Sequence, residues 1–209
     1  MIINGEHVDA ASGATMEVRN PANGQVVDTV PRADAEDTRR AIDAAAAAFP
    51  GWSKLAPTRR ADILFEAARC VKEHLDDVAQ LLTSEQGKPI RDSRIETTRF
   101  AETIEIYAGL VKGGALAGKH VQLPAQKAQG LVVRRPIGVV GAIIPWNFPW
   151  TLRANKIAPG LAVGNTVVAK PASTTPLATL RLAELMLSGG LPAGVLNIVT
   201  GPGGVVGDE

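Results

Sequence analysis

The sequence has little cysteine, few aromatic residues and no excess of either charge. Its 209 residues include one cysteine, Cys70, so no disulfide can form within the chain. Aromatic residues make up 4%, so a core must be built mainly from Ala, Val, Ile and Leu. Lys and Arg total 22 against 21 for Asp and Glu, a net charge of +1. This balance gives no reason to expect nucleic acid or an anionic membrane as a partner.

Long apolar runs are missing as well. No uninterrupted stretch reaches the roughly 18 apolar residues that a membrane-spanning helix needs. The residues after Met1 lack the basic and apolar pattern of a signal peptide. We therefore expect a cytoplasmic protein that does not enter a membrane. The three histidines, His7, His74 and His120, lack metal-ligand spacing, so no metal is expected.

The first part of the chain, up to residue 118, contains short strands followed by helices. Asn4-Gly5 is typical of a hairpin turn, because both residues tolerate positive φ. Asp34 and Asp37 form a box-like cap at the start of a helix that Pro50-Gly51 is expected to end. Helices are predicted over 35–49, from near Thr58 to Gly87, and over 91–112.

After Gly130 the pattern changes to strands that alternate with helices. Strands are predicted over 131–136, 138–144, 165–170 and 195–200, and helices over 151–163 and 176–188. Near-continuous apolar runs such as 138–144 are typical of strands buried on both faces. The alternation predicts an α/β fold with a parallel sheet and right-handed crossovers. We expect the last strand, 195–200, to leave an unpaired edge.

In an open parallel sheet, ligands bind at the carboxyl ends of the strands. After Ile144 comes Pro145-Trp146-Asn147-Phe148-Pro149-Trp150, in which two prolines fix the backbone around an amide that can donate hydrogen bonds. The structural alternative is a rigid turn in which Asn147 bonds its own backbone. Lys170 ends the next strand, where an ammonium suits ribose hydroxyls or a phosphate. A lysine that reaches past the sheet to solvent is the alternative there.

Two further features follow these strands. Ser173 or Thr174 could simply cap the next helix. Gly201, Gly203 and Gly207 approximate a dinucleotide fingerprint, but the third glycine falls one place late. By themselves these glycines are weak evidence for phosphate binding, and a simple glycine-rich turn is the favoured interpretation.

Taken together, the sequence resembles the aldehyde dehydrogenase superfamily over essentially its whole length. The Pro-Trp-Asn-Phe-Pro segment and the Gly-Leu-Pro-Ala-Gly run, at their observed spacing, are the specific part of this match. The matching segments are Glu85-Gln86-Gly87-Lys88-Pro89, Arg135 to Val139, Pro145 to Pro149, Lys170-Pro171-Ala172, and Gly190 to Asn197.

The resemblance implies a Rossmann-like, cofactor-binding fold and the oxidation of an aldehyde to a carboxylic acid with NAD or NADP, through a cysteine thiohemiacetal. Asn147 matches the residue that donates its amide to the thiohemiacetal oxygen, and Lys170 matches the one that holds the adenosine ribose. The other positions that match cofactor-binding residues are Ile144, Pro145, Trp146, Ala172, Ser173, Gly203 and Gly207.

The resemblance also implies a division of the chain. Residues 1–118 match the helical part of the cofactor-binding domain, 119–136 the strands that serve subunit assembly, and 137–209 a βαβαβ cofactor-binding portion. The complete enzyme is expected to be a homo-oligomer, a dimer or a tetramer. The Glu85 to Pro89 run leans towards the branches that oxidise semialdehydes and hydroxyaldehydes.

The sequence departs from the family in two respects. Many members have a glutamate at the position of Ser173, where a carboxylate repels a 2′-phosphate, so NADP is expected to be tolerated as well as NAD. Family members are roughly twice as long, and their nucleophilic cysteine and glutamate base are expected beyond the position of Glu209. Cys70 cannot replace that cysteine, because a lone helical cysteine is most often a small buried hydrophobe.

Three interpretations therefore stay open. The chain is the front part of a complete aldehyde dehydrogenase, a truncated product without dehydrogenase activity that serves at most in binding or assembly, or part of a relative that passes the acyl group to coenzyme A. The coding sequence after Glu209 separates the first two interpretations. Product analysis with and without coenzyme A tests the third.

Overall fold

A five-stranded sheet forms the centre of the molecule, in the order β2-β1-β9-β8-β7. The computed structural model describes the backbone of residues 1–209 and the side chains of all of them except residues 126 and 150. The strands of the sheet are β1 (Ile2–Ile3), β2 (Glu6–His7), β7 (Val139–Ile143), β8 (Thr166–Lys170) and β9 (Leu196–Ile198). β7, β8 and β9 run parallel, which confirms the predicted α/β class.

The predicted edge of the sheet was wrong. The last strand, β9, is covered by the N-terminal hairpin, because Ile2 pairs with Ile198 in antiparallel register. Asn4 and Gly5, both at positive φ, form the turn of that hairpin as predicted. The strands at the two edges of the sheet are β2 and β7.

Most predicted helices are present, with two corrections. Asp34 caps α1 in a full capping box with Asp37, but Pro50 does not end that helix. The last turn continues because Trp52 is buried and its indole Nε1 donates to the carbonyl oxygen of Leu161 at 3.0 Å. The predicted second helix is two helices that meet at His74. The helices are α1 (Ala35–Lys54), α2 (Pro57–Glu73), α3 (Leu75–Gln86), α4 (Ile90–Lys112), α5 (Pro149–Ala162), α6 (Leu177–Ser188) and α7 (Gly203–Val206).

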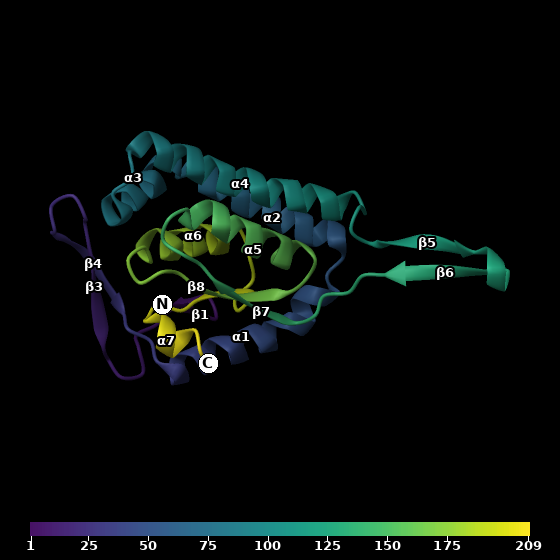
Figure 1. Cartoon of the computed structure of the whole chain (residues 1–209), viewed down its shortest axis with the longest axis horizontal. Coiled ribbons are helices and arrows are strands. Elements are labelled where there is room, and N and C mark those ends of the chain that lie inside the picture. The colour runs from purple at the N-terminus through teal and green to yellow at the C-terminus, as the bar shows by residue number, and fades with distance from the viewer.

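The helices form layers on the sheet (Figure 1). α5 and α6 cover one face and α1 covers the other. α2, α3 and α4 form an outer layer that packs on α5 and α6. Small residues permit this close packing, and Ala41, Ala61, Ala101 and Ala158 are almost fully buried. The order of layers leaves the carboxyl ends of the parallel strands at one end of the sheet.

Two hairpins stand apart from the central sheet. β3 (Thr15–Arg19) pairs with β4 (Val26–Pro31), and β5 (Gly118–Leu123) pairs with β6 (Ala128–Val133). A short 3-10 helix, η1 (Pro124–Gln126), joins β5 to β6. The second hairpin projects from the body as an arm (Figure 1). The predicted strand 131–136 thus lies partly in β6, which ends at Val133 because the arm returns to the body there.

Within the described ranges, no helix is long and apolar enough to cross a membrane.

Candidate functional site

The first two predicted ligand positions lie beside each other at the carboxyl ends of β7 and β8. Ile143 is the register partner of Lys170, and the backbone N–H of Ile144 donates to the carbonyl oxygen of Lys170 at 3.0 Å. The third position joins them through Ser173, whose Oγ donates to the carbonyl oxygen of Gly201 at 3.0 Å. Ser173 therefore links two strand exits instead of capping α6. All three positions therefore lie at the end of the sheet where the parallel strands have their carboxyl ends, as the sequence predicts.

Lys170 is a buried lysine and not a surface residue. It is 7% exposed, and its Nζ donates to the carbonyl oxygen of Pro171 at 2.9 Å. Burial lowers the pKa of the Lys170 ammonium, because desolvation disfavours the charged form. An ammonium has three donors, so this one bond leaves two of them for a ligand.

A cavity of about 320 Å³ opens in front of Lys170. Ile42, Ile143 and Val206 supply apolar walls, and Lys170 supplies the cation. Gly207 also lines it, where a Cβ would lie 2.5 Å from the carbonyl oxygen of Gly203. An apolar slot with one ammonium suits an aromatic base joined to a sugar with vicinal hydroxyls, so the residues present fit the adenosine end of a dinucleotide. The other lining residues are Thr38, Val139, Gly141, Ala142, Val168 and Glu209.

Of the predicted cofactor residues, Lys170 and Gly207 line this cavity. Ile144, Pro145, Trp146, Ala172, Ser173 and Gly203 are not in its lining. Ile144 is buried beneath the strand ends, and Trp146 is 61% exposed on the turn that follows. Asn147 is exposed on that same turn, directly before α5. The Asn147 amide and the Lys170 ammonium thus follow neighbouring strands, but they do not line the same cavity. The side chain of Trp150 lies outside the described residues.

Sequence reasoning missed the role of the residues around Gly87. Glu85 is 2% exposed, and its carboxyl accepts from the backbone N–H groups of Leu177 at 2.7 Å and Ala178 at 3.1 Å. It therefore caps α6 from a different helix. Burial raises the pKa of Glu85 to about 8, against the two N–H donors and Arg153, which lower it. The run from Glu85 to Pro89 contained a signal for this cap, because charged and amide side chains at the end of a helix need hydrogen-bond partners.

Arg153 is a cation that is buried near this cap. Burial lowers the pKa of its guanidinium to about 10, while Glu85 and Glu96 raise it. The carboxylate of Glu96 accepts from the backbone N–H of Thr151 at 3.2 Å, in the first turn of α5. Carboxyl groups from the outer layer thus accept hydrogen bonds at the N-termini of both α5 and α6, where backbone N–H groups have no partner within the helix.

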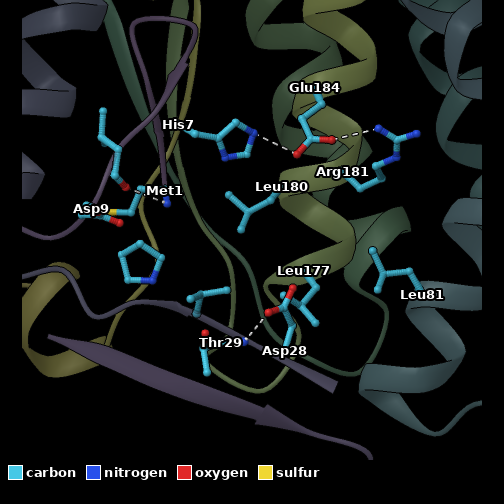
Figure 2. A pocket seen from close by; sticks show the side chains of 13 residues that line it. Met1, His7, Asp9, Asp28, Thr29, Leu81, Leu177, Leu180, Arg181 and Glu184 are labelled. Atoms are coloured by element: carbon cyan, nitrogen blue, oxygen red, sulfur yellow. Dashed lines mark hydrogen bonds and ion pairs between the residues drawn. The ribbon is translucent and has the colours of Figure 1, made fainter. Parts of the chain in front are cut away.

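A second cavity, of about 330 Å³, lies between β4 and α6 (Figure 2). His7 extends towards Glu184, with 3.0 Å between Nε2 and the carboxylate, and Arg181 binds the same carboxylate at 2.9 Å. Leu177 and Leu180 supply its apolar wall. None of the predicted site residues lines this cavity.

Cys70 is in the hydrophobic core, where α2 packs, as predicted. Among residues 1–125, 127–149 and 151–209, no group of three or more His, Cys, Asp or Glu side chains could hold a metal ion.

Three parallel strands with crossover helices, and a cation and a glycine turn at their carboxyl ends, place the chain among the α/β folds that bind ligands at that end of the sheet. Comparison with known proteins is more specific. The model of the aldehyde dehydrogenase family matches residues 7–209, so this chain belongs to the aldehyde dehydrogenase family.

Individual relatives support the same assignment. The chain is 45% identical to succinate-semialdehyde dehydrogenase (NADP(+)) of Escherichia coli strain K12, over 100% of this chain and 43% of the relative. It is 44% identical to glutarate-semialdehyde dehydrogenase of Pseudomonas putida, over 99% of this chain and 43% of the relative. The crystal structure of PnpE in complex with nicotinamide adenine dinucleotide matches with a TM-score of 0.93 and 40% identity, over 99% of this chain and 42% of that one. The chain therefore spans less than half the length of these relatives.

Proposed function

We propose that residues 1–209 are the cofactor-binding front part of an NAD(P)-dependent dehydrogenase that oxidises an aldehyde, in particular a semialdehyde, to a carboxylic acid. The observation that carries the proposal is the position of Lys170 and of the Asn147 turn at neighbouring strand ends. The names of the two semialdehyde dehydrogenases above support the substrate class.

NAD or NADP is the cofactor in this proposal. Lys170 would hold the ribose hydroxyls, while Ile42, Val206 and Gly207 would form the wall around the adenine. Ile144, Pro145, Trp146, Ala172, Ser173 and Gly203 stay predicted cofactor residues. When bound, the nicotinamide supplies a hydride acceptor. Ser173 is neutral, so no carboxylate repels a 2′-phosphate there.

Asn147 is the catalytic residue that we assign within this chain. Its amide would donate to the oxygen that becomes negative when a thiolate adds to the aldehyde. A positioned donor at such an oxygen contributes about 10²- to 10³-fold in rate. We place the thiolate outside residues 1–209, because Cys70, the one cysteine of the sequence, lies on α2 in the hydrophobic core. The resemblance to the family places the general base outside these residues as well.

The β5–β6 arm, residues 118–133, makes up most of the predicted assembly segment 119–136 and is proposed as an assembly element of a homo-oligomer. Leu131, Val132 and Val133 are 66%, 45% and 53% exposed on it. Since side chains alternate along a strand, both faces of β6 present apolar groups that contact with another copy of the chain would bury. The proposal divides the rest of the chain into the helical part, 1–118, and the βαβαβ portion, 137–209, of a cytoplasmic enzyme.

The test is expression of the complete reading frame that carries residues 1–209, followed by assay with a panel of semialdehydes and simple aldehydes. We expect reduced nicotinamide and the free acid as products, in equal amounts. An acyl thioester formed only with coenzyme A would assign the acylating reaction instead. A soluble, folded product that binds NAD(P) but oxidises no aldehyde would support the inactive remnant.

A further inference from the structure

The turn that carries Asn147 is in contact with the outer helix layer through its backbone. Gln86 is the last residue of α3, and its Nε2 donates to the carbonyl oxygens of Trp146 at 3.1 Å and Asn147 at 3.2 Å. One amide group therefore binds the peptide units on both sides of the Asn147 Cα. Rotation of either peptide unit would break one of these bonds.

Lys88 and Glu96 hold the residues that follow Asn147. The Lys88 ammonium lies 5.2 Å from the centroid of the Phe148 ring, a cation–π distance. The same ammonium forms an ion pair with Glu96, and the two side chains are 12% and 6% exposed. Glu96 in turn accepts the backbone N–H of Thr151 at 3.2 Å. These contacts of Lys88 and Glu96 thus fix the backbone from Phe148 into the first turn of α5.

Gly87 makes this arrangement sterically feasible. It has φ +83°, and an added Cβ would lie 2.7 Å from Cγ of Pro21. Only glycine adopts this left-handed position here without strain, so α3 ends between Gln86 and Lys88. The change of direction at Gly87 allows the side chains of Gln86 and Lys88 to contact the same turn, at residues 146–148.

We propose that Gln86, Lys88 and Glu96 are positioning residues that fix the direction of the Asn147 amide, and we name these three residues the brace. This inference rests on the proposed function of Asn147. Trp146 and Phe148 are 61% and 57% exposed, so apolar packing contributes little to holding the turn. Polar contacts from the brace supply the constraint instead, at the peptide units before and after Asn147 and at the start of α5.

The test uses the complete gene product and the variants Gln86→Ala and Lys88→Met. Gln80→Ala on α3 and Arg91→Met in the first turn of α4, which begins shortly after Lys88, are matched controls, because both side chains are exposed. Hydrogen exchange of the peptide that covers residues 146–152 reports how often this turn opens, because the backbone N–H groups exchange only when the turn opens. Loss of the contacts that Gln86 or Lys88 makes with the turn should accelerate exchange there by about 3- to 10-fold, with no change in the controls.

Steady-state kinetics report the consequence for Asn147. Both brace variants should lower kcat about 10-fold, while the Kd for NAD(P) and the melting temperature change little, because misplacement of an oxyanion donor affects the transition state. Lys88→Arg keeps the charge and should restore most of the rate. Exchange and kcat equal to those of the controls would overturn the proposal. If the wild-type protein oxidises no aldehyde, the proposed function fails. The exchange experiment still decides whether the brace holds the turn.

Discussion

Replacement of Lys170 by alanine is expected to weaken NAD binding about 100-fold. The Lys170 Nζ already donates to the carbonyl oxygen of Pro171 at 2.9 Å, which leaves two of its three donors for the ribose hydroxyls. A hydrogen bond from a charged group is worth about 1.5–3 kcal/mol, so two such bonds at the lower value contribute about 3 kcal/mol. Since about 1.4 kcal/mol is tenfold in affinity, their loss corresponds to about two orders of magnitude in Kd.

Isothermal titration calorimetry of NAD into the complete gene product measures this change. Lys156→Ala is the matched control, because Lys156 is an exposed lysine of α5. Burial lowers the pKa of Lys170, so the ammonium is charged below that pKa and loses its proton as the pH rises through it. The affinity of the wild type for NAD should therefore fall as the pH rises through the pKa of Lys170. The affinity of Lys170→Arg should stay constant over the same pH range. A Lys170→Ala variant within about 3-fold of the wild-type Kd would refute the assigned role.

Two further predictions concern Ser173 and Glu85. Ser173→Glu should weaken NADP binding at least about 10-fold relative to NAD, because like charges repel, and the wild type should bind both cofactors. A wild type that strongly prefers NAD would contradict the prediction for Ser173. Burial raises the pKa of Glu85 to about 8 from its ordinary value of 4.5, so the folded protein keeps a proton that the unfolded chain releases. Wild-type stability should therefore fall as the pH rises between those values. In Glu85→Gln this slope should be smaller, measured as urea midpoints at several pH values, and equal slopes would argue against a protonated carboxyl.

Much of the fold follows from local patterns in the sequence. The apolar runs before Ile144 and Lys170 predicted parallel strands, and the structure confirms both strands. Burial on both faces holds for β8, but it was wrong for β7, which lies at the edge of the sheet with Ile143 59% exposed. The parallel strands then placed Ile144 and Lys170 beside each other at the carboxyl ends of β7 and β8. The capping box at Asp34 was likewise visible in four consecutive residues.

What could not be predicted depends on contacts between distant segments. Pro50 ends a helix by local rules, yet the anchored Trp52 carries α1 beyond it. The sheet edge was misplaced because Ile2 and Ile198 pair from opposite ends of the chain. The hydrogen bonds of Gln86 join a helix end to backbone carbonyls 60 and 61 residues further on, and backbone acceptors have no sequence signature.

The most direct test of the account is the rate of hydride transfer in Asn147→Ala. With the complete gene product, a semialdehyde and saturating NAD(P), the appearance of reduced nicotinamide in a single turnover is measured against the wild type. We predict a decrease of about 10²- to 10³-fold with the Kd for NAD(P) nearly unchanged, as expected when one oxyanion donor is removed. A rate within about 3-fold of the wild type would contradict the role of Asn147.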